Sequence, residues 1–159
     1  MDNIEIRTAQ VADLEQLNAL MFRLHDEHHT QCPEHFKSAV EIEQEKSIAR
    51  YLDDPEAVVF VALETNNIVG FVSGHFCELV STVSKPVQMG SIDELYVTPE
   101  CRQLGIAKLL CHEIEQRFDE YGVQQIFVEV WDFNNTALEF YYDAGFSHHI
   151  HWLRKPVNV

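Results

Sequence analysis

The sequence has few basic residues: 11 lysines and arginines stand against 26 aspartates and glutamates, a formal net charge of −15. Because lysine and arginine dominate the binding of nucleic-acid phosphates, this balance argues against a nucleic-acid partner. No apolar run approaches the ~20 residues of a membrane helix, and the first residues lack the basic and apolar segments of a signal peptide. We therefore expect a soluble, cytoplasmic protein with no membrane partner.

Cysteine is scarce, and none of the four cysteines forms a C-x-x-C pair. Together with the absence of secretion signals, this spacing indicates reduced thiols. Histidines cluster at 25–29 and 148–151, but their spacing fits no standard zinc motif, so we expect no metal. Whether these histidine-rich segments bind anything is left open by the sequence. Neither common nucleotide signature, G-x-x-x-x-G-K-[ST] or G-x-G-x-x-G, is present.

The apolar residues that are present predict one α/β domain over 1–159, with 46% hydrophobic residues. Period-two or short apolar runs predict strands, and spacings of three and four predict helices. We expect a loop or a broken helix at 25–37 and a loop at 79–89. The predicted strands cover 4–7, 58–63, 68–76, 92–97, 126–131 and 146–153, and the predicted helices cover about 13–24, 38–52, 106–121 and 134–144.

The passage from the strand ending at Val97 into the helix beginning at Ile106 carries the most informative pattern. A helix start has unpaired N–H groups and a partial positive charge, so it is a ready anion site. Gly105 lets backbone approach a phosphate without a Cβ in the way, and Arg102 and Lys108 add positive charge. An α/β loop without a ligand would also use a glycine here, so this turn alone leaves both interpretations open.

Several segments together resemble one family. Arg102-x-x-Gly105-x-Ala107 resembles the pyrophosphate motif R/Q-x-x-G-x-G/A of the GNAT superfamily of acyl-CoA-dependent N-acyltransferases. The matching segments follow one another in the order expected for this family over nearly the whole chain, which makes the combination specific. The other matching segments are Ile6-Arg7-x-Ala9, 68–72, Leu95-Tyr96-Val97-x-Pro99-Glu100 and Asn134-x-x-Ala137-Leu138-x-Phe140-Tyr141-x-x-x-Gly145-Phe146.

The resemblance implies a mixed, mostly antiparallel sheet of about six to seven strands flanked by helices. It also implies transfer of an acetyl group from acetyl-CoA to a primary amine of a small molecule or peptide, by direct attack in a ternary complex. The alternative is a non-catalytic acyl-CoA sensor or interaction domain. The implied cofactor-binding residues are Leu95, Tyr96, Val97, Arg102, Gln103, Leu104, Gly105, Ile106, Ala107, Lys108, Asn134 and Tyr141.

The resemblance makes Tyr141 the acid that protonates the departing thiolate. The base is less well defined, because Asp93 and Glu94 both lie on the strand that leads into the turn. Strand alternation puts them on opposite faces, Asp93 with Leu95 and Val97 and Glu94 with Tyr96. Some polyamine acetyltransferases of the superfamily carry an acidic base at the position of Asp93, and other members work through ordered water.

The resemblance assigns acceptor specificity to about 22–40 and to 78–89. The first segment holds the acidic and imidazole side chains of Asp26, Glu27, His28, His29 and Glu34. A cationic amine would find complementary charge there, although a solvated loop has the same composition. Homodimers are common in the family, so the resemblance also implies a homodimer as the assembly to test.

Overall fold

The computed structural model describes residues 3–158, so the predicted domain bounds 1 and 159 lie outside it. The chain divides into two compact units, one ending at Val128 and one beginning at Glu129. Each is described by itself. The strands are β1 (Ile4–Thr8), β2 (Ala57–Glu64), β3 (Asn67–Leu79), β4 (Val87–Val97) and β5 (Gln125–Val128), and the helices are α1 (Leu14–Gln31), α2 (Ala39–Glu45), α3 (Ala49–Asp53), α4 (Ile106–Glu120) and α5 (Asn135–Asp143).

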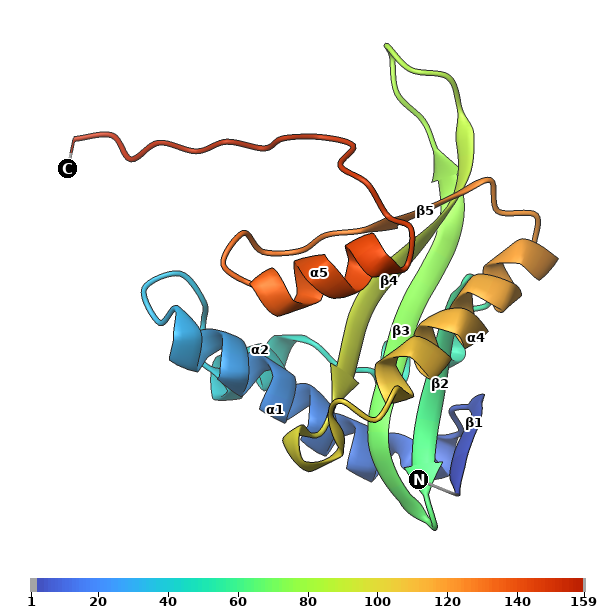
Figure 1. Ribbon diagram of the computed structural model, residues 1–159. Coiled ribbons are helices and arrows are strands. Elements are labelled where there is room, and N and C mark those ends of the chain that lie inside the picture. The colour runs from blue at the N-terminus through green and yellow to red at the C-terminus, as the bar shows by residue number, and fades with distance from the viewer. Residues whose placement is uncertain (1–2, 159) are drawn as a thin grey trace. The chain divides into compact units, whose positions relative to one another are not determined.

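The first unit is built on one sheet in the order β1-β2-β3-β4-β5 (Figure 1). Neighbouring strands are antiparallel except β4 and β5, which are parallel. The predicted mixed, mostly antiparallel sheet flanked by helices is thus confirmed. The described residues form five strands, however, fewer than the six to seven expected.

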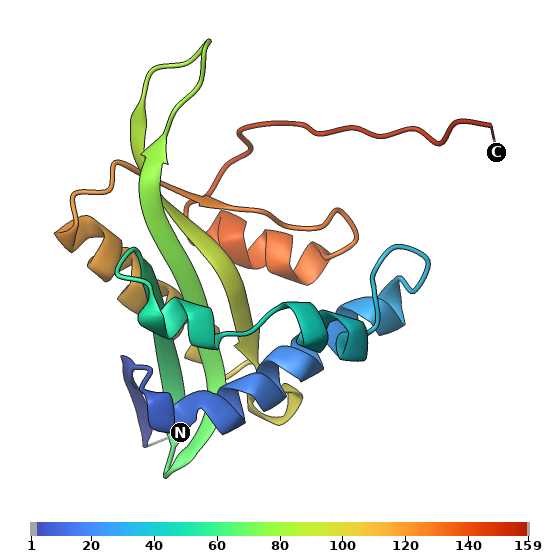
Figure 2. The ribbon, with the colours of Figure 1, turned by 180° about the vertical axis from the view of Figure 1, so that it is seen from behind.

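Helices cover both faces of this sheet, as the opposite views of Figures 1 and 2 show. The apolar stripe of α1, which includes Leu17 and Leu24, packs with Phe71 and Tyr96 on the face that we call the α1 face. The short helices α2 and α3 lie beside α1 on that face. Ile48, between α2 and α3, belongs to the core on this face, and Tyr51 and Leu52 of α3 pack against that core. Ile42 of α2 lines a pocket together with residues of α1.

The opposite face, the α4 face, holds the buried stripe of α4. A Cβ at Gly90 would lie 2.6 Å from the ring of Phe118, and one at Gly74 would lie 2.8 Å from Ile114. Glycine is therefore needed at both positions, because α4 approaches the backbone of the sheet too closely for a side chain. These contacts also establish which residues of β3 and β4 face α4.

Several element bounds differ from the sequence prediction. The helix α1 continues to Gln31 instead of ending near residue 24, and the expected helix over 38–52 is divided into α2 and α3. The expected loop 79–89 is shorter, because the ladder of β3 and β4 extends to the pair Leu79 and Val87. Local composition could not show these pairings, since the partner strand decides them.

The second unit contains α5 and the segment that follows it. The side chain of Asn134 accepts a hydrogen bond from the amide of Ala137 at 3.2 Å and so caps the start of α5. The strand predicted over 146–153 is wrong, since this segment is irregular. A strand needs a partner for its backbone groups, and residues 129–158 of this unit contain no other strand.

Candidate active site

The turn before α4 has the geometry of an anion site. Gly105 is left-handed with φ 83°, and Gln103 two residues earlier is left-handed with φ 63°. In the described structure no side chain caps the helix, so the first-turn amides of Ile106, Ala107 and Lys108 are left without the usual cap. A Cβ at Gly105 would meet no atom within 4 Å, so the space in front of these amides is open.

The predicted cofactor residues of this turn therefore lie together at one helix start. Their side chains differ in burial: that of Ile106 is 1% exposed and anchors the helix in the core, whereas that of Leu104 is 46% exposed. The side chain of Lys108 is exposed beside the turn. Left-handed residues and helix N–H groups that converge in this way form a nest for an anion.

The strand β4 offers an open edge next to this turn. Its ladder with β5 ends at the pair Ile92 and Val128, so the rest of β4 pairs only with β3 among the described residues. The amide of Thr98 donates to the carbonyl of Val69, which fixes the alternation of the antiparallel ladder. It follows that the backbone groups of Leu95 and Val97 point away from β3, towards the open edge.

Arg102 binds the protein itself. Its Nε donates to the carbonyl oxygen of Val97 at 2.8 Å, and its Nη2 lies 3.0 Å from both carboxylate oxygens of Glu27 on α1. Its guanidinium also lies 5.3 Å from the ring centre of Tyr96. The side chain thus fastens the turn to α1, and the groups left to contact a ligand at the turn are the backbone amides and Lys108.

A β-bulge in β4 changes the expected arrangement of the two acidic residues. Ser73 pairs with Glu94 and Gly74 pairs with Ile92, so Asp93 has no partner residue on β3. Ile92 shares the α4 face with its partner Gly74, whereas Glu94 bonds Ser73 on the α1 face. Simple alternation would have put Ile92 and Glu94 on one face.

The prediction that Asp93 and Glu94 face opposite sides of the sheet is therefore wrong. Asp93 contacts His75 and Ser91, which alternate with the α4-facing residues Gly74 and Gly90 and so lie on the α1 face. Both carboxylates accordingly lie on the α1 face, beneath α2 and α3. The one extra residue of the bulge is the cause.

The Asp93 carboxylate accepts three hydrogen bonds. Its Oδ2 lies 2.8 Å from the hydroxyl of Tyr51 on α3 and 2.7 Å from Nδ1 of His75 on β3. Its Oδ1 accepts from the hydroxyl of Ser91 at 2.7 Å. We call Asp93, Tyr51, His75 and Ser91 the bulge cluster. It lies where β5 leaves β4, at the start of the open edge.

Glu94 is buried next to the bulge cluster. Its Oε1 accepts from the hydroxyl of Ser73 at 3.0 Å, and its Oε2 lies 3.1 Å from the ammonium of Lys46. Burial raises the pKa of Tyr51, and the charges of Glu94 and Asp93 raise it further. The Tyr51 hydroxyl therefore keeps its proton and can donate it to Asp93 in a hydrogen bond.

Sequence reasoning missed Tyr51, His75, Ser91 and Lys46. One signal was available: Ser73 and His75 are polar residues at a spacing of two within an otherwise apolar strand, on the face that holds Phe71. Such a pair marks a polar site on one face of a buried sheet. No comparable signal marks Tyr51 or Lys46, because their distance from Asp93 in the chain hides the contact.

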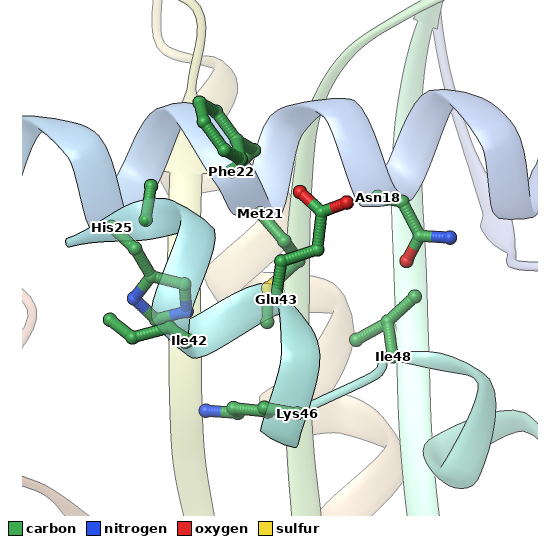
Figure 3. Close-up of a pocket in the computed structure, with 9 residues that line it drawn as sticks. Asn18, Met21, Phe22, His25, Ile42, Glu43, Lys46 and Ile48 are labelled. Carbon is green, nitrogen blue, oxygen red and sulfur yellow. The ribbon is translucent and has the colours of Figure 1, made fainter. Parts of the chain in front are cut away.

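A small pocket lies between α1 and α2, and Lys46 is one of the residues that line it (Figure 3). The Nε2 atom of His25 is buried there without a hydrogen-bond partner. Burial, together with the charges of Lys46 and His28, lowers the pKa of His25 to about 4. The imidazole is thus neutral near pH 7. The pocket is lined by Asn18, Met21, Phe22, His25, Ala39, Ile42, Glu43, Lys46 and Ile48.

The polar segment expected to select the acceptor is largely engaged in internal contacts. The carboxylate of Glu27 accepts from Arg102 and, at 3.3 Å, from the hydroxyl of Tyr96. His28 stacks on Phe36 with ring centres 5.3 Å apart, and Nδ1 of His29 lies 2.8 Å from the carbonyl oxygen of Phe36. These contacts close the end of α1 onto the loop that follows it.

Tyr141 lies in the second unit, on α5. Its ring is buried and meets the edges of two aromatic neighbours, Phe140 and Phe146, with ring centres 5.2 and 5.3 Å away. The neighbouring Tyr142 is 46% exposed, and its hydroxyl bonds Nε2 of His148. The two tyrosines therefore have different surroundings within the unit, as their positions on the helix predict.

None of the helices among the described residues has both the length and the apolar character of a membrane span.

Known proteins are similar to this chain in sequence or in fold. The chain is 27% identical over 116 residues to an uncharacterised N-acetyltransferase of Mycobacterium tuberculosis, which covers 72% of this chain and 69% of the relative. The crystal structure of an acetyltransferase from Vibrio fischeri is 56% identical with a TM-score of 0.68, and the match covers 80% of this chain and 96% of that one. An aminoglycoside N-acetyltransferase in complex with CoA has a TM-score of 0.71 at 15% identity, over 99% of this chain and 96% of that one.

The sequence pattern of the acetyltransferase (GNAT) family matches residues 21–146. That range contains the turn at Gly105, the bulge cluster and α5, so the match includes every predicted catalytic residue. The chain belongs to the acetyltransferase (GNAT) family and is an acetyltransferase.

Proposed function

We propose that this protein transfers an acetyl group from acetyl-CoA to a primary amine of a small molecule or peptide, by direct attack in a ternary complex. One observation carries the proposal: the uncapped, open helix start at Gly105 follows directly on the open edge of β4. A phosphate-bearing thioester with an extended arm fits these two features, because it needs anion contacts at one end and backbone contacts along the other.

The donor contacts follow from the backbone. Amides from Gln103 to Lys108 bind the pyrophosphate, and the outward groups of Leu95 bind the pantetheine arm and the acyl carbonyl. The Val97 carbonyl already accepts from Arg102, which leaves its N–H for the ligand. The structure of the aminoglycoside N-acetyltransferase contains CoA, which supports this choice of donor.

The acceptor contacts depend on side chains of the α1 face. Asp93 and Glu94 lie there together, and the whole chain carries a net charge of −15. We propose a cationic amine as acceptor, which these carboxylates attract and whose ammonium loses a proton to a base on this face before attack. A second structure of the aminoglycoside enzyme holds a bisubstrate analogue of CoA and acetylneamine, which supports direct transfer to an amine in that fold.

Tyr141 is the proposed acid. After the amine nitrogen bonds the acetyl carbon and the carbon–sulfur bond breaks, its hydroxyl protonates the thiolate. This role requires that the two units act as one domain over 1–159, which is part of the proposal. Asn134 lies at the start of the same helix, where it caps α5 and stays a predicted CoA contact. The homodimer and the cytoplasmic location stay predictions.

The test is an amine panel of polyamines, aminoglycosides, amino acids and peptides, assayed with acetyl-CoA for thiol release. With a confirmed acceptor, we expect Tyr141→Phe to lower kcat by roughly 10²-fold while CoA affinity, measured by calorimetry, stays unchanged. Tyr142→Phe is the matched control, since it removes a hydroxyl from the next residue of the helix, and it should retain full turnover.

Equal kinetics of Tyr141→Phe and the unmodified enzyme would remove Tyr141 from the role of acid. Tight CoA binding without thiol release for any amine would contradict catalysis and favour a non-catalytic acyl-CoA sensor. No thermal shift with CoA would contradict the donor assignment.

A further inference from the structure

His75 and Asp93 form a hydrogen-bonded pair, and the carboxylate determines which ring nitrogen of His75 carries the proton. Nδ1 of His75 lies 2.7 Å from Oδ2 of Asp93. An ionised carboxylate can only accept, so Nδ1 carries the proton and donates it to Asp93. In the neutral imidazole, Nε2 is then the atom with a free lone pair. The Asp93 contact thus determines both the tautomer and the orientation of the ring.

The two partners differ in how much of each is available to a substrate. The Asp93 carboxylate already accepts from Tyr51, His75 and Ser91, and its side chain is 16% exposed. The His75 side chain is 42% exposed. A carboxylate held by three donors is suited to orient a neighbour, whereas the more exposed imidazole is suited to meet a ligand.

The position of the pair on the sheet matches the acceptor end of the proposed site. Asp93 is the bulged residue and lies two positions before Leu95, whose backbone faces the open edge. The other titratable groups around the pair are Tyr51, which donates to Asp93, and the ion pair of Glu94 with Lys46. Since Lys46 already pairs with Glu94, Asp93 is the carboxylate left to stabilise a protonated imidazole.

We propose that His75 is the base that takes the proton from the acceptor ammonium, and that Asp93 is the positioning residue that holds its ring. The proposal rests on the acetyl transfer proposed above. His75 Nε2 accepts one proton from the ammonium, and the amine lone pair then forms the bond to the acetyl carbon as the carbon–sulfur bond breaks. Tyr141 gives its proton to the sulfur and regains one from the new amide nitrogen. The proton on His75 returns to solvent, and Asp93 stabilises the imidazolium meanwhile.

The test compares His75→Gln with Asp93→Asn. Glutamine keeps a donor for Asp93 but cannot accept the proton, so we expect kcat/KM for an ammonium substrate to fall roughly 10²-fold and the acidic limb of its pH profile to disappear. Asp93→Asn should lower kcat/KM but keep the acidic limb, because the proposed base is still present. His112→Gln, an exposed histidine of α4, is the control and should change neither.

A second substrate separates a chemical from a structural role. An amine that is already neutral at the assay pH needs no base before attack, so His75→Gln should transfer to it within about threefold of the unmodified rate. The CoA affinity of both variants should stay unchanged in calorimetry. Added imidazole should restore turnover to His75→Ala, which tests the same role in a variant without the glutamine contact.

The proposal would be overturned if His75→Gln kept the acidic limb and Asp93→Asn lost it, since Asp93 would then be the base itself. Equal losses with ammonium and neutral amines would also overturn it, because they would indicate a structural role. No turnover by the unmodified protein with any amine would overturn both this inference and the proposed function.

Discussion

The turn at Gly105 and the bulge cluster lie at opposite ends of the same open edge of β4, and they are built from different parts of their residues. The turn presents backbone amides, a left-handed glycine and empty space. The bulge cluster presents side chains from β3, β4 and α3 that bond one another. One half of the candidate site depends on backbone conformation, and the other depends on a network of carboxylate, imidazole and hydroxyl groups.

This difference places different requirements on the sequence of the two halves. A helix start binds a phosphate through atoms that every residue carries, so its requirements are few: a positive φ and no obstructing side chain. A polar cluster binds a particular amine through side chains, and each of them can be replaced. Substitutions in the two halves should therefore affect different measured quantities.

The largest effect is expected at the donor turn. Valine at Gly105 must adopt φ 83°, at a cost of about 1–2 kcal/mol, and its side chain would fill the open space before the amides. We expect Gly105→Val to weaken CoA binding at least tenfold in calorimetry. Gly122, at the other end of α4, also has positive φ, at 78°, and open space around it. Gly122→Val should cost similar stability yet bind CoA normally, and equal Kd values for the two variants would contradict the anion site.

A smaller effect is expected when a charge is removed from the acceptor half. Glu94→Gln keeps a partner for Ser73 but removes one negative charge from the proposed acceptor side and leaves Lys46 without its carboxylate partner. We expect kcat/KM for a cationic amine to fall about fivefold, with CoA affinity unchanged. Asp119→Asn, at the exposed end of α4, should change the same value less than about twofold. An equal effect of both variants would mean that overall charge, and not the position of Glu94, attracts the amine.

The smallest effect concerns His25, in the pocket between α1 and α2 next to the acceptor half. It changes the pH dependence of the free energy of unfolding. His25 has a folded-state pKa of about 4, below the ~6.5 of an unfolded histidine. Between these values the unfolded chain binds the proton and the folded chain does not, so stability falls as the pH drops from about 6.5 to 4. Melting curves of His25→Gln should show a shallower loss over this window, whereas His112→Gln should follow the unmodified protein. Parallel curves for all three proteins would show that His25 is not the group responsible.

Much of the donor half could be predicted from the sequence. A strand, a turn with Gly105 and an apolar helical stripe follow one another within a short segment, so local patterns were sufficient. The role of Arg102 was less accessible, because its partner Glu27 is far away in the chain. The sequence indicated a cation near the turn, but only the folded chain shows that this cation is bound by α1.

The acceptor half could be predicted only in part. Asp93 and Glu94 were identified as candidates, but their faces were predicted wrongly, since one extra residue in a ladder leaves no mark in composition. The lengths of β3 and β4 and the break between α2 and α3 were missed for a related reason. Pairing between distant segments decides such details, and local propensity does not report it.

The bulge at Asp93 also changes which alternate residues of β4 face each side of the sheet. Before it, the even-numbered residues Gly90 and Ile92 turn their side chains to α4, and after it the even-numbered Glu94 and Tyr96 turn theirs to α1. The same shift exchanges the residues whose backbone groups face β3, so that Leu95 and Val97 come to face outwards. Deletion of one residue at this position would therefore restore continuous alternation. It would reverse both the faces of the side chains and the direction of the backbone groups on one side of the bulge. The two halves of the site thus share one register, although they share no side chain.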